Sequence, residues 1–301
     1  MEKEKVSNLG PFAALIGVQV LFGSLPVIGK VVLAVLPAVA LVGFRVGITA
    51  LVLFIIQYFR GRLWLKEKDD YARLAILSLF GVTFNQLLFI GGLSLTKASN
   101  TSLLAVTIPI FTIAIGAVIG TERLRLIKTL GIVLAAAGVI VLIDPRNASF
   151  SSETTIGDLL IIVNSLSYGI YVATSKEIIT RNGAFRSMMW VFIFASIICV
   201  PLGLVSIYSV EISAVSSFIW LLVLYIAVVA TAGPYLLNAY ALANVNASTV
   251  AVFIYLQPVI GFLLAAYFLG ESIDLRFLFA AVMVFIGVYL TTKKAGPAPN
   301  T

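Results

Sequence analysis

The sequence predicts an all-α integral membrane protein with ten transmembrane helices arranged as two inverted five-helix repeats. The first reason is composition: 61% of the 301 residues are hydrophobic, 11% are charged, and the mean hydropathy is +1.10. A soluble domain would expose this apolar surface to water, so lipid is the expected solvent. The second reason is a pattern that recurs 149 residues later: Ala98, Ser99, Pro109, Glu122 and Gly138 return as Ala247, Ser248, Pro258, Glu271 and Gly287.

Ten apolar segments are long enough to cross a bilayer, which takes about 20 residues per helix. The first segment follows the charged stretch Met1–Lys5 without a small-residue cleavage site, so we expect a retained helix rather than a signal peptide. In chain order the segments are 10–31, 37–59, 72–93, 99–120, 127–144, 157–177, 186–208, 216–239, 248–269 and 275–292. The polar, proline-rich tail 293–301 is predicted to be disordered.

The basic residues are distributed unequally between the two sides that these segments define. With the N-terminus inside, 15 Lys and Arg residues lie in inner segments and 4 in outer ones, and Arg45 lies within a helix. Cytoplasmic loops carry the excess of Lys and Arg in membrane proteins. We therefore expect a multi-pass protein with both termini in the cytoplasm. The short loops and the absence of sorting motifs favour the plasma (inner) membrane.

The connection 144–152 is the only long polar stretch between predicted helices, and it divides the chain into a first repeat, 10–144, and a second repeat, 157–292. Each repeat holds five segments. Because five is odd, the second repeat enters the membrane from the opposite side, which makes the repeats inverted. Doubled membrane units of this kind are most often transporters. One chain holds both halves, so a monomer is sufficient, and a dimer is compatible with this arrangement.

Two halves that each run Ala-Ser, Pro, Glu and Gly resemble the EamA family of the drug/metabolite transporter superfamily, over about residues 11–292. Further matches are Phe22-Gly23 before Lys30, Tyr168-Gly169 before Lys176, and the arginine at position 45. The family usually has tryptophan at the aromatic position. The resemblance implies a ten-helix carrier of amino acids, other metabolites or drugs. Related branches carry sugar phosphates and nucleotide sugars.

Polar side chains inside the predicted helices are candidates for a substrate pathway, because polar groups in hydrocarbon are costly unless they face protein or water. Two sets of polar residues have the spacing i, i+4, i+7, which places each set on one helix face. They are Asn164, Tyr168 and Tyr171, and Thr231, Tyr235 and Asn238. With single residues from other helices, the candidates for substrate binding are Gln19, Arg45, Asn85, Gln86, Asn164, Tyr168, Tyr171, Thr231, Tyr235, Asn238 and Tyr255. Such groups also serve as hydrogen bonds between helices, and this alternative stays open. Tyr255 and Gln257 point in different directions, so at most one is expected to reach a cavity.

Arg45 lies about two turns inside its predicted helix, where a guanidinium needs a partner. One interpretation is an anchor for a substrate carboxylate or phosphate. The other is a pair that supports the fold, or a side chain that extends toward the outer surface. From the sequence we expect the structural interpretation.

Charged residues at the helix ends suggest gates. Lys30 and Glu271 are expected at the outer surface, and Lys176 and Glu122 at the inner surface, so that one repeat-related pair closes each side of a cavity. An architectural role is the alternative, since surface ion pairs usually contribute under about 1 kcal/mol.

Two prolines are expected to kink the helices that hold them. Pro109 and Pro258 lie in the middle of apolar segments, where proline removes a backbone donor. The kinks either free carbonyl groups toward a cavity or are purely architectural.

The residue inventory excludes most catalytic sites. The chain has no histidine and a single cysteine, Cys199, so it has no His-ligated metal, no Ser-His triad and no internal disulfide. No metalloprotease, hydrolase or P-loop motif is present. We expect no enzymatic activity, no catalytic residue, no metal and no cofactor. The net charge of +7 is scattered through short interhelical segments, so we expect no nucleic-acid partner.

The sequence also suggests the kind of transport. No Asp or Glu lies in the middle of a predicted helix, which favours a facilitator or exchanger, or coupling through Glu122 or Glu271. Aromatic and amide groups with few charges suit a small neutral or zwitterionic molecule. We expect a secondary transporter that exports or exchanges an amino acid-like metabolite by alternating access. Phosphorylated sugars, nucleotide sugars and drug-like compounds are the alternative substrates, and a passive channel is the alternative class.

Overall fold

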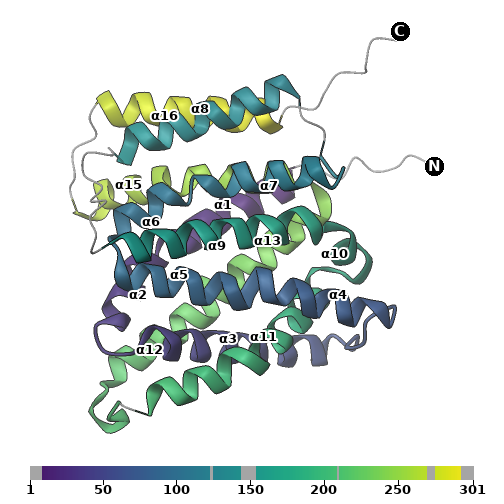
Figure 1. Cartoon of the computed structure of the whole chain (residues 1–301), viewed down its shortest axis with the longest axis vertical. Coiled ribbons are helices and arrows are strands. Elements are labelled where there is room, and N and C mark those ends of the chain that lie inside the picture. The colour runs from purple at the N-terminus through teal and green to yellow at the C-terminus, as the bar shows by residue number, and fades with distance from the viewer. Residues whose placement is uncertain (1–8, 123–124, 144–153, 209, 270–274, 293–301) are drawn as a thin grey trace.

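The computed structural model describes residues 9–122, 125–143, 154–208, 210–269 and 275–292, and every regular element in these ranges is helical (Figure 1). Seven helical stretches are long and apolar enough to cross a membrane: Leu9–Leu33, Ala38–Phe59, Asp69–Leu95, Thr155–Thr174, Ala184–Ile207, Ser217–Asn244 and Leu275–Thr292. Three shorter apolar stretches are Thr107–Val118, Leu126–Leu142 and Ala247–Ile260. The chain is therefore a multi-pass membrane protein.

The first half of the chain forms α1 (Leu9–Gly23), α2 (Leu25–Leu33), α3 (Ala38–Phe59), α4 (Asp69–Ser78), the π-helical segment η1 (Leu79–Thr83), α5 (Phe84–Leu95), α6 (Ala98–Leu104), α7 (Thr107–Val118) and α8 (Leu126–Ile143). The second half forms α9 (Thr155–Thr174), α10 (Lys176–Asn182), α11 (Ala184–Ile207), the 3₁₀ turn η3 (Ile212–Ala214), α12 (Ser217–Ala227), the π-helical segment η4 (Val228–Ala232), α13 (Gly233–Asn244), α14 (Ala247–Val252), the 3₁₀ turn η5 (Phe253–Tyr255), α15 (Leu256–Leu269) and α16 (Leu275–Thr292).

Four segments that the sequence predicts as unbroken helices are interrupted, namely 10–31, 99–120, 157–177 and 248–269. The break in 157–177 falls at Ser175, between α9 and α10, and proline explains the other three. Pro109 has no N–H for the carbonyl of Ala105, which instead accepts from Ile108 N at 3.0 Å, and the chain breaks between α6 and α7. Pro258 lies four residues after Ile254, and the 3₁₀ turn η5 forms there. Pro26 stands at the start of α2, where it follows the break after Gly23.

The two π-helical segments occupy corresponding positions in the two halves. In η1, Phe84 N donates to Leu79 O, and in η4, Gly233 N donates to Val228 O, so both show the wider i to i+5 bond. Leu79 and Val228 are 149 residues apart, the same spacing as the recurring sequence pattern. A π segment shifts the helix face by part of a turn. Both segments lie directly before the residues that form the centre of the protein.

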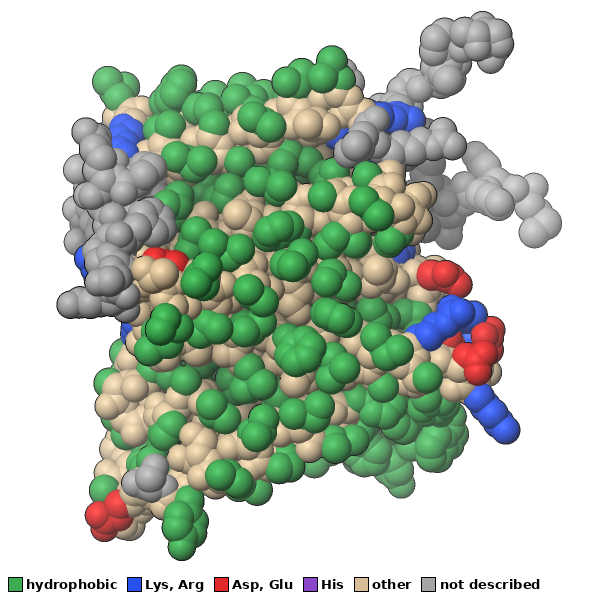
Figure 2. Space-filling model, viewed as in Figure 1, with side chains coloured by type: hydrophobic (Ala, Val, Ile, Leu, Met, Phe, Trp, Pro, Cys, Tyr) green, Lys and Arg blue, Asp and Glu red, His purple; other side chains and the backbone are tan. Residues whose placement is uncertain are grey.

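The helices run roughly parallel to one another, so the protein has two ends (Figure 1). We call the end where α9 passes into α10 the α10 end, and the end where α5 passes into α6 the α6 end. The charged side chains visible in Figure 2 lie at these ends, and a belt of hydrophobic side chains covers the face between them. This distribution fits a bilayer in which the ends face water.

Glycines allow the closest helix contacts. A Cβ added to Gly43 of α3 would lie 2.8 Å from Gly203 Cα of α11. A Cβ added to Gly131 of α8 would lie 2.7 Å from Gly287 O of α16. Small residues let backbones approach in this way in membranes, where dispersion contacts rather than the hydrophobic effect hold helices together.

Candidate functional site

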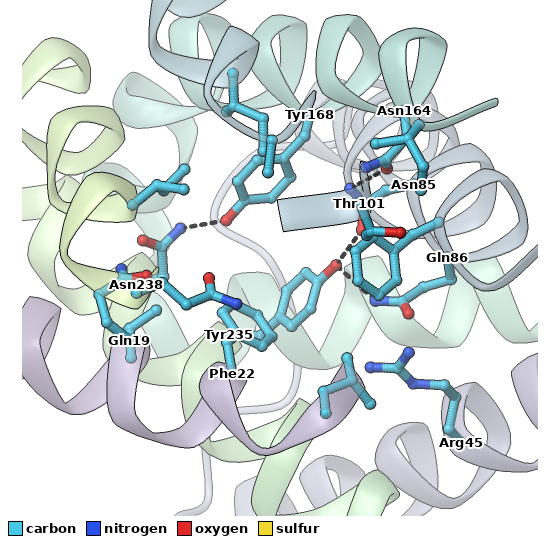
Figure 3. Close-up of a pocket in the computed structure, with 18 residues that line it drawn as sticks. Gln19, Phe22, Arg45, Asn85, Gln86, Thr101, Asn164, Tyr168, Tyr235 and Asn238 are labelled. Atoms are coloured by element: carbon cyan, nitrogen blue, oxygen red, sulfur yellow. Dashed lines mark hydrogen bonds between the residues drawn. The ribbon is translucent and has the colours of Figure 1, made fainter. Parts of the chain in front are cut away.

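A cavity of about 100 Å³ lies at the centre of the protein, surrounded by helices of both halves (Figure 3). Its walls combine apolar side chains with hydrogen-bonding groups. Eight of the residues predicted from the sequence line it: Gln19, Arg45, Asn85, Gln86, Asn164, Tyr168, Tyr235 and Asn238. These residues come from α1, α3, α5, α9 and α13, so the fold gathers polar groups that are far apart in the sequence.

Tyr235 is the centre of a hydrogen-bond network on one wall. Gln86 Nε2 donates to Tyr235 Oη at 2.8 Å. The same hydroxyl lies 2.9 Å from Gly81 O and 2.9 Å from Asn85 Oδ1, and its single proton serves one of these acceptors at a time. Tyr235 is only 2% exposed, so these bonds hold a phenol deep inside the protein.

Two further pairs extend the polar lining. Asn85 Nδ2 donates to Asn164 Oδ1 at 2.7 Å, which joins the network of Tyr235 to α9. Asn238 Nδ2 donates to Tyr168 Oη at 2.8 Å and links α13 to α9. Since each amide and phenol keeps unused acceptor or donor capacity, a small ligand in the cavity can exchange hydrogen bonds with these groups.

Arg45 is fully buried, and Thr231 is its hydrogen-bond partner. Arg45 Nε and Nη2 donate to Thr231 Oγ1 at 3.1 and 2.8 Å. Thr231 Oγ1 in turn donates to Ile226 O at 2.6 Å. Arg45 Nη1 has no hydrogen-bond partner in the described part of the chain, and no carboxylate there pairs with the guanidinium. The partner is thus a hydroxyl of another helix, and the buried side chain does not extend toward the outer surface.

Three predicted binding residues do not line the central cavity. Tyr171 is 1% exposed, its ring packs against Gly81, and its hydroxyl lies 3.5 Å from Met188 Sδ. Thr231 is 0% exposed and orients Arg45 by accepting its hydrogen bonds. Tyr255 donates to Val106 O at 2.9 Å beside a smaller cavity. For these three residues the structure supports the alternative interpretation, helix-to-helix hydrogen bonding or packing.

Some lining residues are absent from the prediction. Gln257 reaches the cavity and Tyr255 does not, so the choice between these two neighbours was wrong. Thr101 of α6 also lines it, as do the rings of Phe22 and Phe89. Polar character in an apolar segment was a usable signal for Thr101 and Gln257. Phe22 carried a signal as the aromatic residue of the repeated Phe22-Gly23 and Tyr168-Gly169 pattern, whereas nothing in the sequence separates Phe89 from the other phenylalanines.

The lysines predicted as gates make equivalent contacts at opposite ends. Lys30 Nζ donates to Thr96 O at 2.9 Å, at the α6 end. Lys176 Nζ donates to Val245 O at 2.8 Å, at the α10 end. Thr96 and Val245 are 149 residues apart, so the two bonds correspond under the sequence repeat. Each lysine therefore binds a backbone carbonyl just before a short helix. Lys30 binds before α6, and Lys176 binds before α14.

The carboxylate predicted to pair with Lys176 pairs with a different lysine. Glu122 Oε2 lies 3.1 Å from Lys128 Nζ, whereas Lys176 makes its bond to Val245 O. Glu122 Oε1 also accepts from Ser248 N at 3.0 Å, in the first turn of α14. A carboxylate there satisfies a free N–H and interacts favourably with the helix dipole. The predicted partner of Lys30, Glu271, lies outside the described residues, as do the tail 293–301 and the connection 144–152.

The chemistry of the lining suits the binding of a small polar molecule. Within the described ranges no group of three His, Cys, Asp or Glu side chains is placed to hold a metal ion. The cavity presents amides, phenols, a threonine hydroxyl and one guanidinium. Pro109 and Pro258 do not line it and act through the helix breaks described above.

Comparison with known proteins places the chain in a family. Two segments, residues 9–144 and 155–293, match the model of the EamA-like transporter family. An uncharacterized transporter of Archaeoglobus fulgidus is 29% identical over 75% of this chain and 78% of its own length. The uncharacterized transporter YoaV of Bacillus subtilis is 22% identical over 92% of this chain and 95% of its own length.

A solved crystal structure has the same fold. It superposes with a TM-score of 0.77 at 17% identity, and the match covers 95% of this chain and 98% of the other. The family match, the transporter relatives and the apolar helices agree with one another. The chain therefore belongs to the EamA-like transporter family of the drug/metabolite transporter superfamily, and it is a membrane transporter.

Proposed function

We propose that this protein is a secondary transporter that moves a small neutral or zwitterionic metabolite, similar to an amino acid, across the plasma membrane by alternating access. The observation that carries the proposal is the position of the cavity between the two halves. Gln86 and Tyr235, which stand at corresponding positions of the halves, hydrogen-bond to each other on its wall. A binding site at the interface of two repeats is the arrangement that secondary transporters use.

The proposed topology has ten spans in two inverted five-helix repeats. The seven long apolar stretches provide seven spans, and the three shorter stretches provide the others, each extended by adjoining helical residues. The corresponding breaks between α6 and α7 and between α14 and α15 support the repeat, as do η1 and η4. The excess of Lys and Arg in the segments of the α10 end supports a cytoplasmic position for this end and for both termini.

In this topology the contacts at both ends are formed, since Lys176 binds Val245 O at the α10 end and Lys30 binds Thr96 O at the α6 end, which fits a state closed at both ends. At the α10 end, Glu122 also binds Ser248 N and Lys128. The lining includes Leu25 of α2 and Thr101 of α6, which lie toward the α6 end. Access would alternate when the contacts of Lys30 and Lys176 form and break in turn.

The size of the cavity favours small substrates. Its volume of about 100 Å³ is below the roughly 300–1,000 Å³ of pockets for drug-sized ligands. Nucleotide sugars and drug-like compounds would require a much wider opening. Among phosphorylated sugars, the charge of a phosphate exceeds what the single guanidinium of the lining can neutralise. An amino acid-like molecule fits both constraints.

The test is counterflow in proteoliposomes. Vesicles loaded with unlabelled amino acids are diluted into a labelled pool, with and without an imposed pH gradient. Saturable counterflow supports a carrier, and accumulation above equilibrium with the gradient shows proton coupling. Unsaturable flux with single-channel currents would establish the passive channel instead. No uptake of any pooled amino acid by folded protein would refute the substrate class.

A further inference from the structure

The central cavity contains one unbalanced charge. Arg45 is 0% exposed, lines the cavity, and belongs to a side-chain type that is always protonated. Among the described residues that line the cavity there is no Asp or Glu. A charge without a partner in a dry interior is strongly unfavourable, so proteins rarely retain one without a reason. The fold therefore holds a cation where a bound molecule would supply the balancing charge.

The contacts of Arg45 fix its orientation and leave one side free. Thr231 Oγ1 accepts from Nε and Nη2 at 3.1 and 2.8 Å. The hydroxyl proton of Thr231 is committed to Ile226 O at 2.6 Å, so an oxygen lone pair faces the guanidinium. The π-helical segment η4 contains Thr231 and so sets the position of this hydroxyl. A guanidinium held by a neutral acceptor keeps its full charge.

The free nitrogen belongs to a guanidinium that lies beside the polar wall (Figure 3). Arg45 Nη1 has no hydrogen-bond partner among the described residues, although it is buried. Figure 3 shows the guanidinium on the same side of the cavity as Gln86 and Tyr235. Gln86 and Tyr235 hydrogen-bond to each other at 2.8 Å, and neither side chain carries a charge. The vacant donor and the polar wall together form a subsite for an anionic oxygen.

We propose that Arg45 is the anion anchor of the cavity and that the transported molecule carries a carboxylate. This inference rests on the proposed function and narrows its substrate class. One guanidinium neutralises a monoanion, so a carboxylate fits better than a phosphate dianion. Organic cations, including diamines and quaternary amines, are repelled. Lys30, the other cation in the membrane-spanning part of this region, is bound to Thr96 O and does not line the cavity.

Ligand-induced thermal stabilisation of the purified protein tests the anchor directly, because a ligand that binds the folded state raises the unfolding temperature by an amount that grows with the logarithm of ligand concentration over Kd. Three probe mixtures are compared at equal ionic strength: glycine, alanine, serine and valine; the amides of the same amino acids; and acetate, propionate and butyrate. We expect stabilisation by the carboxylate mixtures and none by the amides. Equal stabilisation by acids and amides would overturn the proposal.

Substitutions then locate the effect. Arg45→Gln should weaken carboxylate binding about 10- to 100-fold, which corresponds to one or two charge-assisted hydrogen bonds. Arg45→Lys should retain part of the affinity, and Arg73→Gln, an exposed arginine at the α10 end, should change nothing. Thr231→Val should weaken binding to a smaller degree, because it keeps the charge and removes the acceptor that orients it.

The unfolding temperature of Arg45→Gln without ligand distinguishes an anion anchor from an arginine that supports the fold. Removal of an unbalanced buried charge should leave the unfolding temperature unchanged or raise it, whereas a marked fall, or failure to fold, would show a structural role and refute the anchor. Counterflow of pooled amino acids reports on the proposed function independently. If Arg45→Gln transports amino acids with an unchanged KM, the anchor is refuted and the proposed function still stands. Carboxylate binding without amino acid transport refutes the amino acid-like substrate class and leaves the anchor in place.

Discussion

Gln86 donates a 2.8 Å hydrogen bond to Tyr235, a residue 149 positions later in the chain. The same separation relates the recurring sequence pattern, so these residues stand at corresponding positions of the two halves and meet at their interface. Val106 and Tyr255 repeat the relationship, since Tyr255 donates to Val106 O across the same 149 positions. Two corresponding residues can touch only where the halves are in direct contact. The cavity therefore lies where relative motion of the halves would reshape it.

Tyr235→Phe should impair both substrate binding and folding. The change removes the acceptor of Gln86 Nε2 and the donor to Gly81 O or Asn85 Oδ1, and each unsatisfied buried group costs about 1–3 kcal/mol. We expect a lower unfolding temperature and a KM for counterflow that rises at least about tenfold, since this factor corresponds to 1.4 kcal/mol. Tyr289→Phe is the matched control, because Tyr289 is 62% exposed on α16. A wild-type KM in Tyr235→Phe would show that the network does not contact the substrate.

Glu122 and Lys128 should be energetically coupled. The carboxylate is largely buried, lies 3.1 Å from Lys128 Nζ, and also accepts from Ser248 N. A double-mutant cycle with Glu122→Gln and Lys128→Met should give a coupling energy of about 1–2 kcal/mol in the free energy of unfolding. The exposed pair Arg73 and Glu177, 4.0 Å apart, should give less than about 0.5 kcal/mol in the same cycle. Equal coupling in both pairs would contradict a specific role for Glu122 at the start of α14.

Lys176→Ala should open the α10 end. The loss of the 2.8 Å bond to Val245 O removes about 1.5 kcal/mol from the closed state, which raises the population open at that end by roughly tenfold. The measurement is the labelling rate of Asn238→Cys in a Cys199→Ser background, with an impermeant thiol reagent applied from the cytoplasmic side. Lys66→Ala is the control, since this exposed side chain at the same end makes no ion pair in the described ranges.

Lys30→Ala should produce the corresponding effect at the α6 end, where Lys30 donates to Thr96 O at 2.9 Å. Thr101→Cys in the same background reports access from the outer side, because Thr101 lines the cavity in α6. We expect faster labelling and altered transport. Unchanged labelling together with unchanged transport would exclude Lys30 as an outer gate and leave it an architectural role.

Gly43→Ala should destabilise the contact between α3 and α11. The added Cβ would lie 2.8 Å from Gly203 Cα and 2.9 Å from Cys199 O, and neither backbone atom can move aside alone. Overpacking of this kind costs typically about 1–3 kcal/mol. Gly23→Ala is the control, because nothing lies within 4 Å of a Cβ there. Thermal unfolding in detergent compares the two, and equal unfolding temperatures would refute the packing argument.

The sequence predicted the helical stretches well because lipid permits few alternatives. A backbone in hydrocarbon must satisfy its own hydrogen bonds, so a long apolar segment becomes a helix. The prediction 275–292 coincides with α16, and 127–144 differs from α8 by one residue at each end. The predictions failed where a local feature interrupts an otherwise apolar run, as at Pro109 and Pro258. The π segments η1 and η4 carry no proline and no other clear signal in the sequence.

The binding residues show a similar division. Polarity within an apolar segment was enough to select eight lining residues, including Asn164, Tyr168 and Tyr235. It could not separate residues that face the cavity from those that face another helix, as for Tyr171 and Tyr255. This distinction depends on the rotation of each helix about its axis, which the neighbouring helices and the π segments set.

By itself, the sequence determined the membrane environment, the helical class and the recurring pattern, because composition and spacing are properties of the chain alone. Only the tertiary structure decided which charges meet. Glu122 pairs with Lys128 rather than Lys176, and Arg45 meets Thr231 rather than a carboxylate. Partner choice depends on distances between side chains that come from separate helices, and packing alone fixes these distances. The same packing leaves Arg45 buried beside the cavity, with Nη1 unbonded and without a counterion in the described part of the chain.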